Sequence, residues 1–282
     1  MIAQKNISII SNKSYGKAAR RIPESVIERD YCLSWFLIGL SRSLIKDKLI
    51  LKGGTALRRC YFKDYRFSED LDFTLVGKIT VGAIFQEFEN IFKDLKEVVG
   101  ITFGLGNTEP DSKNTHTFYL TYLGPLPRAT KSKEIKVDIT FNEKVITPLE
   151  EKRIIKTYEE YTDFIENQRI IVYSLNEIAI EKVCALLNKA RNEPRDLYDL
   201  WYLVSENKVD LSKLVAQIKE KISFKGGGLE KEVFSKKEKR LKNLWEKRLS
   251  SQMSFLPEFE EVYRTINRAF RQANILSIGK AG

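Results

Sequence analysis

The chain has 282 residues, a formal net charge of +10 and a sequence pI near 9.3. Its hydrophobic content of 43% and charged content of 30% are those of a globular protein and exclude collagen-like, coiled-coil and wholly disordered chains. No apolar run approaches the ~20 residues of a membrane-spanning helix, and the first residues lack the apolar core of a secretory signal. We therefore expect a cytoplasmic protein with no membrane partner.

Cysteine and histidine are too scarce for several classes of site. Cys32, Cys60 and Cys184 are far apart and odd in number, which fits a reduced compartment and indicates neither a disulfide framework nor a zinc site. His116 is the one histidine, so mechanisms with two imidazoles are excluded, and a Ser-His-Asp triad would have to use a residue in a strand-like segment. A hydrogen-bonded or exposed residue is the favoured interpretation of His116. The chemistry is expected to depend on carboxylates, which act together around hard metal ions.

The positive charge is concentrated toward the two ends of the chain. Residues 1–23 hold five basic and no acidic side chains, and residues 219–248 hold eleven basic and five acidic ones. Residues 24–218 carry a net charge of −2. Two interpretations stay open for the basic blocks: solvated helix faces, or a docking surface for a polyanion such as RNA.

Hydrophobic periodicity predicts an α+β part followed by a helical part. In chain order we expect a helix over 24–48, a strand over 49–51, a helix over 55–62, a strand over 71–76 and a helix over 81–99. Strands are expected over 101–105, 117–123, 135–141 and 170–173, with a break at 124–127. Helices are then expected over 175–189, 194–204, 211–222, 229–249 and 258–273, with a glycine hinge at 226–228. The predicted domains are 1–174 and 175–282.

The segment from Leu49 to Leu75 carries the first chemical signal. Gly53 and Gly54 follow an apolar strand and precede a helix, where a tight turn and a helix N-terminus could accept a phosphate. Asp70 and Asp72 then enter the next strand two residues apart, so both carboxylates face the same side. Two close carboxylates repel each other unless a cation lies between them. A structural turn and two solvated aspartates remain the alternative.

A third carboxylate lies on a later strand. Asp138 alternates with Val137 and Ile139, so it faces away from the apolar side of that strand. If this strand pairs with residues 71–76, Asp138 joins Asp70 and Asp72 around one ion site. Divalent ions held in this way can clamp a triphosphate and activate a hydroxyl for in-line attack.

This order of motifs resembles the nucleotidyltransferases of the DNA polymerase β superfamily. Together with NEIAIEK at 176–182 and PRDLYDL at 194–200, the motifs KGGTAL and RFSEDLDF are similar to those of the AbiEii/AbiGii toxin family. Members are nucleotidyltransferase toxins of bacterial toxin–antitoxin (type IV, abortive-infection-like) and phage-defence systems. The resemblance covers about residues 49–203 and implies a polymerase β-like α+β core with a mixed sheet, followed by a helical C-terminal domain.

The resemblance also implies roles for individual residues. Asp70, Asp72 and Asp138 would bind Mg²⁺ or Mn²⁺ and act in catalysis, together with Lys182 and Asp199. Nucleotide binding would fall to Gly53, Gly54, Ser68, Lys182, Arg195 and Asp196. The family usually has an aspartate where this chain has Glu177, so the resemblance assigns that residue no role. Arg58 and Arg59 are expected either to reach phosphate or to be surface charge.

The leading hypothesis is therefore transfer of a nucleoside monophosphate (NMP) from an NTP to the 3′ end of tRNA, which would block translation. A cognate antitoxin is the other implied partner. The acceptor could instead be a protein or a small molecule. A non-catalytic RNA-binding protein and a D-x-D glycosyltransferase are further alternatives, but the complete carboxylate set argues against the first and Asp138 against the second.

Overall fold

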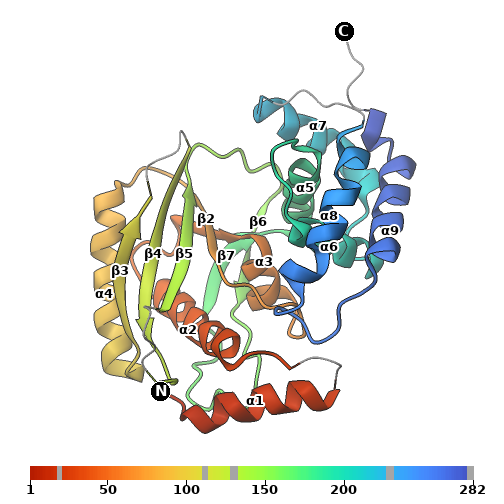
Figure 1. Ribbon diagram of the computed structural model, residues 1–282. Coiled ribbons are helices and arrows are strands. Elements are labelled where there is room, and N and C mark those ends of the chain that lie inside the picture. The colour runs from red at the N-terminus through yellow and green to blue at the C-terminus, as the bar shows by residue number, and fades with distance from the viewer. Residues whose placement is uncertain (18–20, 110–113, 128–132, 227–231, 278–282) are drawn as a thin grey trace. The chain divides into compact units, whose positions relative to one another are not determined.

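The computed structural model describes residues 1–17, 21–109, 114–127, 133–226 and 232–277 (Figure 1). The chain forms two compact units: the first contains Met1–Glu143, Leu149–Val172 and Ser251–Ser254, and the second contains Lys144–Pro148, Tyr173–Ser250 and Phe255–Gly282. The main division thus falls between Val172 and Tyr173. Lys144–Pro148 precedes this point but belongs to the second unit, and Ser251–Ser254 follows it but belongs to the first unit. The division into domains 1–174 and 175–282 stays a prediction.

A seven-stranded mixed sheet is the centre of the first unit, in the order β3-β4-β5-β2-β1-β7-β6. Its strands are β1 (Leu49–Lys52), β2 (Leu71–Leu75), β3 (Thr102–Thr108), β4 (Thr115–Leu123), β5 (Lys133–Thr140), β6 (Leu149–Arg153) and β7 (Arg169–Tyr173). β2 pairs with β1 in the antiparallel direction and with β5 in the parallel direction. The predicted α+β class and mixed sheet are confirmed.

Two helices and the apolar side chains of the sheet form the core of the first unit. Phe36 of α2 (Glu24–Ser41) meets Phe88 of α4 (Val81–Val99) and Phe103 of β3, and Phe88 also lies against Phe118 of β4. Leu71, Phe73, Val137 and Ile139 of the central strands are fully buried. Because side chains alternate along a strand, the residues between them face the opposite side of the sheet.

One helix is shorter than the sequence predicted, and one helix and one strand were not predicted. α2 ends at Ser41 rather than near residue 48, because the Ser41 and Ser43 hydroxyls donate to carbonyls of its last turn and compete with continued helical bonding. α1 (Gln4–Lys17) was not predicted, since few of its residues are apolar, although Ile7 and Ile10 are buried. β6 was not predicted either, since its sequence LEEKR contains a single apolar residue.

The predicted helix over 55–62 is present in an altered form. It begins earlier, as α3 (Gly53–Ala56), and continues as the π-helical turn η1 (Leu57–Tyr61). Such wide turns are rare, and they shift the side chains that follow relative to a regular helix. The apolar period of a short segment cannot reveal that shift.

Helices make up the second unit, as predicted. They are α5 (Leu175–Leu187), α6 (Pro194–Ser205), η2 (Leu211–Leu214), α7 (Val215–Phe224), α8 (Val233–Leu249), α9 (Phe259–Gln272) and η3 (Ile275–Ser277). Phe234 stacks on Tyr263, and Trp245 packs edge-on against Phe259, so α8 and α9 share an aromatic core. Gly227 and Gly228 of the predicted hinge lie outside the described residues, as does the expected start of the 229–249 helix.

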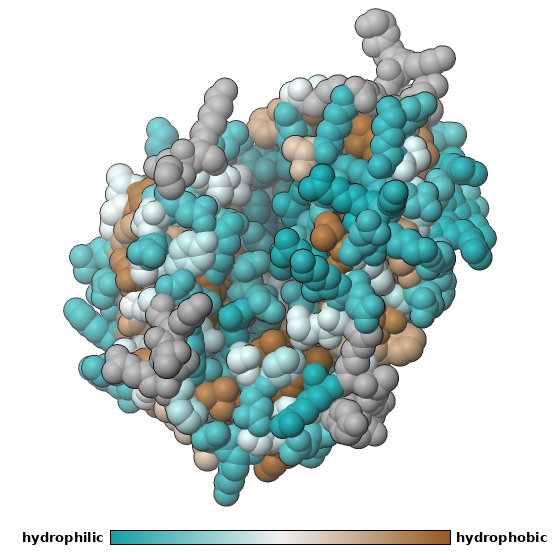
Figure 2. Space-filling view, viewed as in Figure 1, coloured by the Kyte–Doolittle hydropathy of each residue, from teal (hydrophilic) through white to brown (hydrophobic). Residues whose placement is uncertain are grey.

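The surface is mostly hydrophilic in the view of Figure 2, with hydrophobic side chains scattered singly or in small groups. Among the residues that the structure describes, no helix combines the length and hydrophobicity that a membrane span requires.

Candidate active site

In the turn after β1, the backbone of Gly53 lies close to the carboxylate of Asp72. Lys52 pairs with Asp72 across β1 and β2, and Gly53 follows with a φ of +70°. A Cβ atom on Gly53 would lie 2.9 Å from Asp72 Oδ2, closer than atoms in ordinary contact. Glycine is therefore required here for two reasons, the left-handed backbone and the close approach of Asp72.

Gly54 and Ser68 belong to a second close contact of the same turn. A Cβ on Gly54 would lie 2.5 Å from an Arg66 guanidinium nitrogen and 3.1 Å from Ser68 Oγ. The Thr55 hydroxyl donates to Ser68 Oγ at 2.9 Å and also contacts the carbonyl of Asp70. The glycine motif and the segment ahead of β2 are thus held together within the first unit.

The predicted pairing of the two aspartate-bearing strands is confirmed. β2 and β5 run parallel, with Asp72 and Asp138 as direct register partners. Leu71 and Val137 are buried on the other face, so both carboxylates lie on the less buried side of the sheet. Asp138 has two further partners: the Thr117 hydroxyl donates to its Oδ1 at 2.6 Å, and Lys136 Nζ lies 3.0 Å from its Oδ2.

The donor set suits a hard divalent cation, because carboxylate oxygens are the ligands that such ions prefer. Asp72 and Asp138 are neighbours, and Asp70 immediately precedes β2. The described part of the chain has no group of three acidic, histidine or cysteine side chains already gathered at metal-binding distance. The Lys136 ammonium is the cation beside Asp138 here, so a metal ion would compete with it.

The helical motifs form a separate charged cluster within the second unit. Lys182 Nζ on α5 lies 2.7 Å from Asp196 Oδ1 and 2.7 Å from Asp199 Oδ2 on α6. Both carboxylates are buried, with side-chain exposures of 2% and 0%. Their spacing of three residues places them on one helical face. Arg195 lies on the same helix, with its Nε 3.3 Å from Glu193.

Asp196 is charged in spite of its burial. Burial alone would raise its pKa, but the ion pairs with Lys182 and Arg191 outweigh that effect and lower it below the usual value for an aspartate. Arg191 Nε lies 2.5 Å from Asp196 Oδ2. The arrangement fixes α5, α6 and the loop between them, and it also holds a lysine ammonium that a polyphosphate could share.

A family model for the nucleotidyl transferase AbiEii toxin of type IV toxin–antitoxin systems matches residues 35–272. The chain belongs to this AbiEii family. Its members are nucleotidyltransferases, so a nucleotide substrate and a cognate antitoxin are implied. The comparison with curated proteins gives no match.

Solved structures show that the AbiEii chain shares its fold with nucleotidyltransferase toxins. The fold is similar to MenT4, a nucleotidyltransferase toxin from Mycobacterium tuberculosis, with a TM-score of 0.55 and 17% identity over 98% of this chain and 99% of that one. JHP933 from Helicobacter pylori has a TM-score of 0.55 and 18% identity over 91% of this chain and 95% of that one. At these identities the likeness concerns the fold alone.

Glu177 has a clear structural role in this family member. Its Oε2 accepts hydrogen bonds from the backbone N–H groups of Ile146 and Thr147, and its Oε1 lies 2.9 Å from Lys221 Nζ. Both charged side chains are fully buried. The pair attaches the 144–148 segment to the helices of the second unit. Sequence reasoning missed Lys221, because nothing in the local sequence distinguishes it from Lys219 on the same helix, which is exposed.

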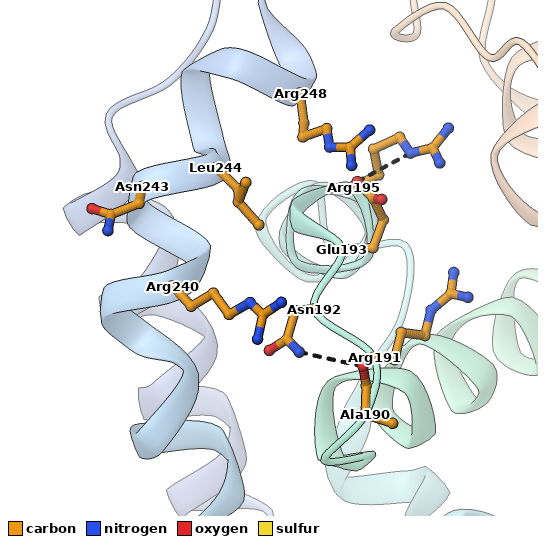
Figure 3. Close-up of a pocket in the computed structure, with 9 residues that line it drawn as sticks. All are labelled: Ala190, Arg191, Asn192, Glu193, Arg195, Arg240, Asn243, Leu244 and Arg248. Carbon is orange, nitrogen blue, oxygen red and sulfur yellow. Dashed lines mark hydrogen bonds and ion pairs between the residues drawn. The ribbon is translucent and has the colours of Figure 1, made fainter.

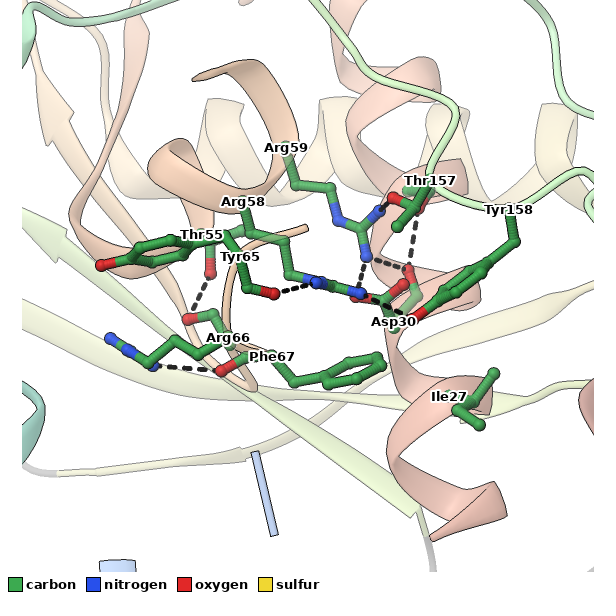
Figure 4. Close-up of polar contacts among 12 residues, drawn as sticks. Ile27, Asp30, Thr55, Arg58, Arg59, Tyr65, Arg66, Phe67, Thr157 and Tyr158 are labelled. Atoms are coloured by element: carbon green, nitrogen blue, oxygen red, sulfur yellow. Dashed lines mark hydrogen bonds and ion pairs between the residues drawn. The ribbon is translucent and has the colours of Figure 1, made fainter. Parts of the chain in front are cut away.

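Both expectations for Arg58 and Arg59 were wrong. The two side chains are 2% and 1% exposed, and both pair with Asp30 of α2 (Figure 4). Arg59 also donates to the Thr157 hydroxyl at 2.9 Å. The ion pairs lower the pKa of Asp30 although burial acts to raise it. These arginines therefore hold the first unit together and are not surface charge.

Two further expectations concern His116 and Lys237. His116 is buried on β4 in a cluster with the rings of Phe85 and Phe118, so it is a core residue and not an exposed one. Lys237, counted with the basic block, was expected on a solvated or RNA-binding face, but it is 5% exposed. Its ammonium donates to the carbonyls of Leu186 at 2.9 Å and Arg191 at 2.7 Å, and so caps the C-terminal end of α5.

Proposed function

We propose that this chain transfers an NMP from an NTP to the 3′ end of a tRNA, with Mg²⁺ or Mn²⁺ as cofactor, and that the modified tRNA no longer supports translation. The observation that carries the proposal is the parallel pairing of β2 and β5, which makes Asp72 and Asp138 neighbours. Membership in a nucleotidyltransferase family supports the reaction class. Since tRNA and NTPs meet in the cytoplasm, the proposal places the protein there.

The reaction is a substitution at the α-phosphorus of the NTP. The acceptor hydroxyl oxygen forms a new bond to this phosphorus, while the bond to the oxygen that bridges to the β-phosphorus breaks and pyrophosphate leaves. Asp138 is proposed to take the hydroxyl proton. Its position beside Asp72 and its hydrogen bond from Thr117 orient the carboxylate for that task.

The carboxylates of Asp70, Asp72 and Asp138 would hold the divalent ion. When bound, the ion would neutralise charge on the triphosphate and on the departing pyrophosphate. Gly53 and Gly54 would leave room for the phosphates, and Ser68 would donate to them. Lys182 is proposed as a cation for the triphosphate, in competition with Asp196 and Asp199, which already neutralise it.

The test is incubation of the purified protein with each α-labelled NTP, Mg²⁺ or Mn²⁺, and total tRNA. Label is expected in RNA with at least one NTP and is expected to disappear with a chelator. Asp72→Asn and Asp138→Asn should each reduce the rate by about 100-fold or more. Asp94→Asn is the matched control, because Asp94 is exposed on α4. Its rate should equal that of the unmodified chain.

The same experiment separates the acceptor classes. Label in a protein band or in a low-molecular-weight product, with none in RNA, would replace tRNA by the other acceptors while keeping the chemistry. Absence of label in every fraction with all NTPs, from a chain that is folded by circular dichroism, would overturn the proposed reaction.

A further inference from the structure

A cavity of about 490 Å³ lies within the second unit, between α8 and the loop that joins α5 to α6. Figure 3 shows Arg240 and Arg248 extending from α8 toward this loop, and Arg191 and Arg195 rising from the loop and the start of α6. Two asparagines, one alanine, one leucine and Glu193 complete the lining. Among the described residues, four arginines and one glutamate therefore contribute to the lining of this cavity.

The charge of this arginine cavity is only partly balanced. Glu193 lies 3.3 Å from Arg195, and Asp196 pairs with Arg191, which keeps a side-chain exposure of 54%. Among the described residues, Arg240 and Arg248 form no ion pair, and both are exposed. These two exposed guanidinium groups are therefore available to an anion that enters the cavity.

The wall of the cavity is fixed by the buried lysine of α8. Lys237 lies one turn before Arg240, and its ammonium donates to the carbonyls of Asn188 and Arg191 in the loop. Burial lowers its pKa to about 8, and its ammonium hydrogens are directed to these carbonyl groups rather than to solvent. The lysine thus attaches α8 to the loop and keeps the two sides of the arginine cavity at a constant separation.

The shape and chemistry of the cavity suit a chain of phosphates. Arg240 and Arg248 are eight residues apart, which is about 12 Å along a helix, longer than one phosphate group. Guanidinium groups bind phosphate oxygens in a bidentate manner and are the usual donors in nucleic-acid recognition. The neighbouring exposed side chains Lys236, Lys239 and Lys247 extend the positive surface along α8 beyond the cavity. An extended anion can use this surface, whereas a single small anion cannot.

We propose that the arginine cavity binds the phosphate backbone of the RNA acceptor. This inference rests on the proposed transfer to RNA and assigns the acceptor a docking site on the helical unit. Contacts to phosphates fix the position of a nucleic acid without reading its sequence. The cavity therefore accounts for affinity for RNA and for its salt dependence, and leaves the choice of nucleotide to other residues.

The test measures binding of fluorescein-labelled tRNA by anisotropy, without NTP, at several salt concentrations. The double variant Arg240→Gln/Arg248→Gln is expected to bind about tenfold more weakly. It should also lose about 1.4 to 1.8 from the slope of log K against log salt, because each lost phosphate contact removes about 0.7 to 0.9. The matched control is Lys208→Gln/Lys213→Gln, which removes two exposed charges from the same unit, outside the cavity and outside the basic surface of α8. The control should change binding by less than about twofold.

Three outcomes overturn the inference: no tRNA binding by the unmodified chain, an equal loss in the control, or a rise in the KM for NTP with unchanged RNA binding. Circular dichroism of all variants verifies that the helical unit is folded. Failure of the proposed function looks different. In that case the double variant loses tRNA binding as expected, but no NMP is transferred to RNA by the unmodified chain.

Discussion

Replacing Gly53 with alanine tests the geometry of the candidate active site at one atom. At a φ of +70°, an L-residue is disfavoured by about 1–2 kcal/mol relative to glycine. The new Cβ would also lie 2.9 Å from Asp72 Oδ2, so the side chain of Asp72 or the backbone at residue 53 has to shift. We expect a loss of about 1–2 kcal/mol in the free energy of unfolding.

The expected loss of activity is larger than the loss of stability suggests. Misplacement of a catalytic group by about 1 Å lowers rates by about 100-fold, so a smaller shift of Asp72 should lower NMP transfer by about tenfold. Urea denaturation followed by circular dichroism gives the first quantity, and the labelled-NTP assay gives the second. The stability measurement is independent of the proposed reaction.

Gly82→Ala is the matched control. Gly82 lies in α4, and a Cβ atom there would have no heavy atom within 4 Å. Alanine should be neutral or stabilise the helix by up to about 1 kcal/mol, without effect on transfer. The reasoning about Gly53 is refuted if Gly53→Ala has the same unfolding free energy as the unmodified chain to within about 0.5 kcal/mol and retains full activity.

Two further predictions concern buried charge. Asp30→Ala leaves the Arg58 and Arg59 guanidinium groups buried without their carboxylate, so it should lower the unfolding free energy by about 3–5 kcal/mol; a loss below about 1 kcal/mol, typical of an exposed pair, would contradict this. The lowered pKa of Asp196 contributes stability that is present above its ordinary pKa of 3.8 and is lost as the pH falls through the lowered value. Lys182→Met should raise that pKa and move acid unfolding to higher pH, and an unchanged acid-unfolding midpoint would disprove the role of the pair.

Local sequence pattern was sufficient for most elements and for the carboxylate motif. The period of 3.6 residues over 81–99 predicted α4 to the residue, and alternation along 135–141 predicted which side of β5 Asp138 occupies. These properties depend on neighbours in the chain, because helix faces and strand faces are set by backbone geometry alone. The family motifs supported the interpretation of the carboxylates as one group, although their strands are distant in the sequence.

Only the tertiary structure decided which charged residues are buried and which distant residues meet. Asp72 and Asp138 are 66 positions apart, and their register depends on how β2 and β5 pair in the sheet. Nothing in the local sequence distinguishes Arg58, Arg59 and Lys237 from charged residues on the surface. Each is nevertheless buried against partners from another element. Burial of a charge is stable only when the fold brings a counter-charge or carbonyl groups to it. That requirement is satisfied in three dimensions, so no local pattern in the sequence reveals it.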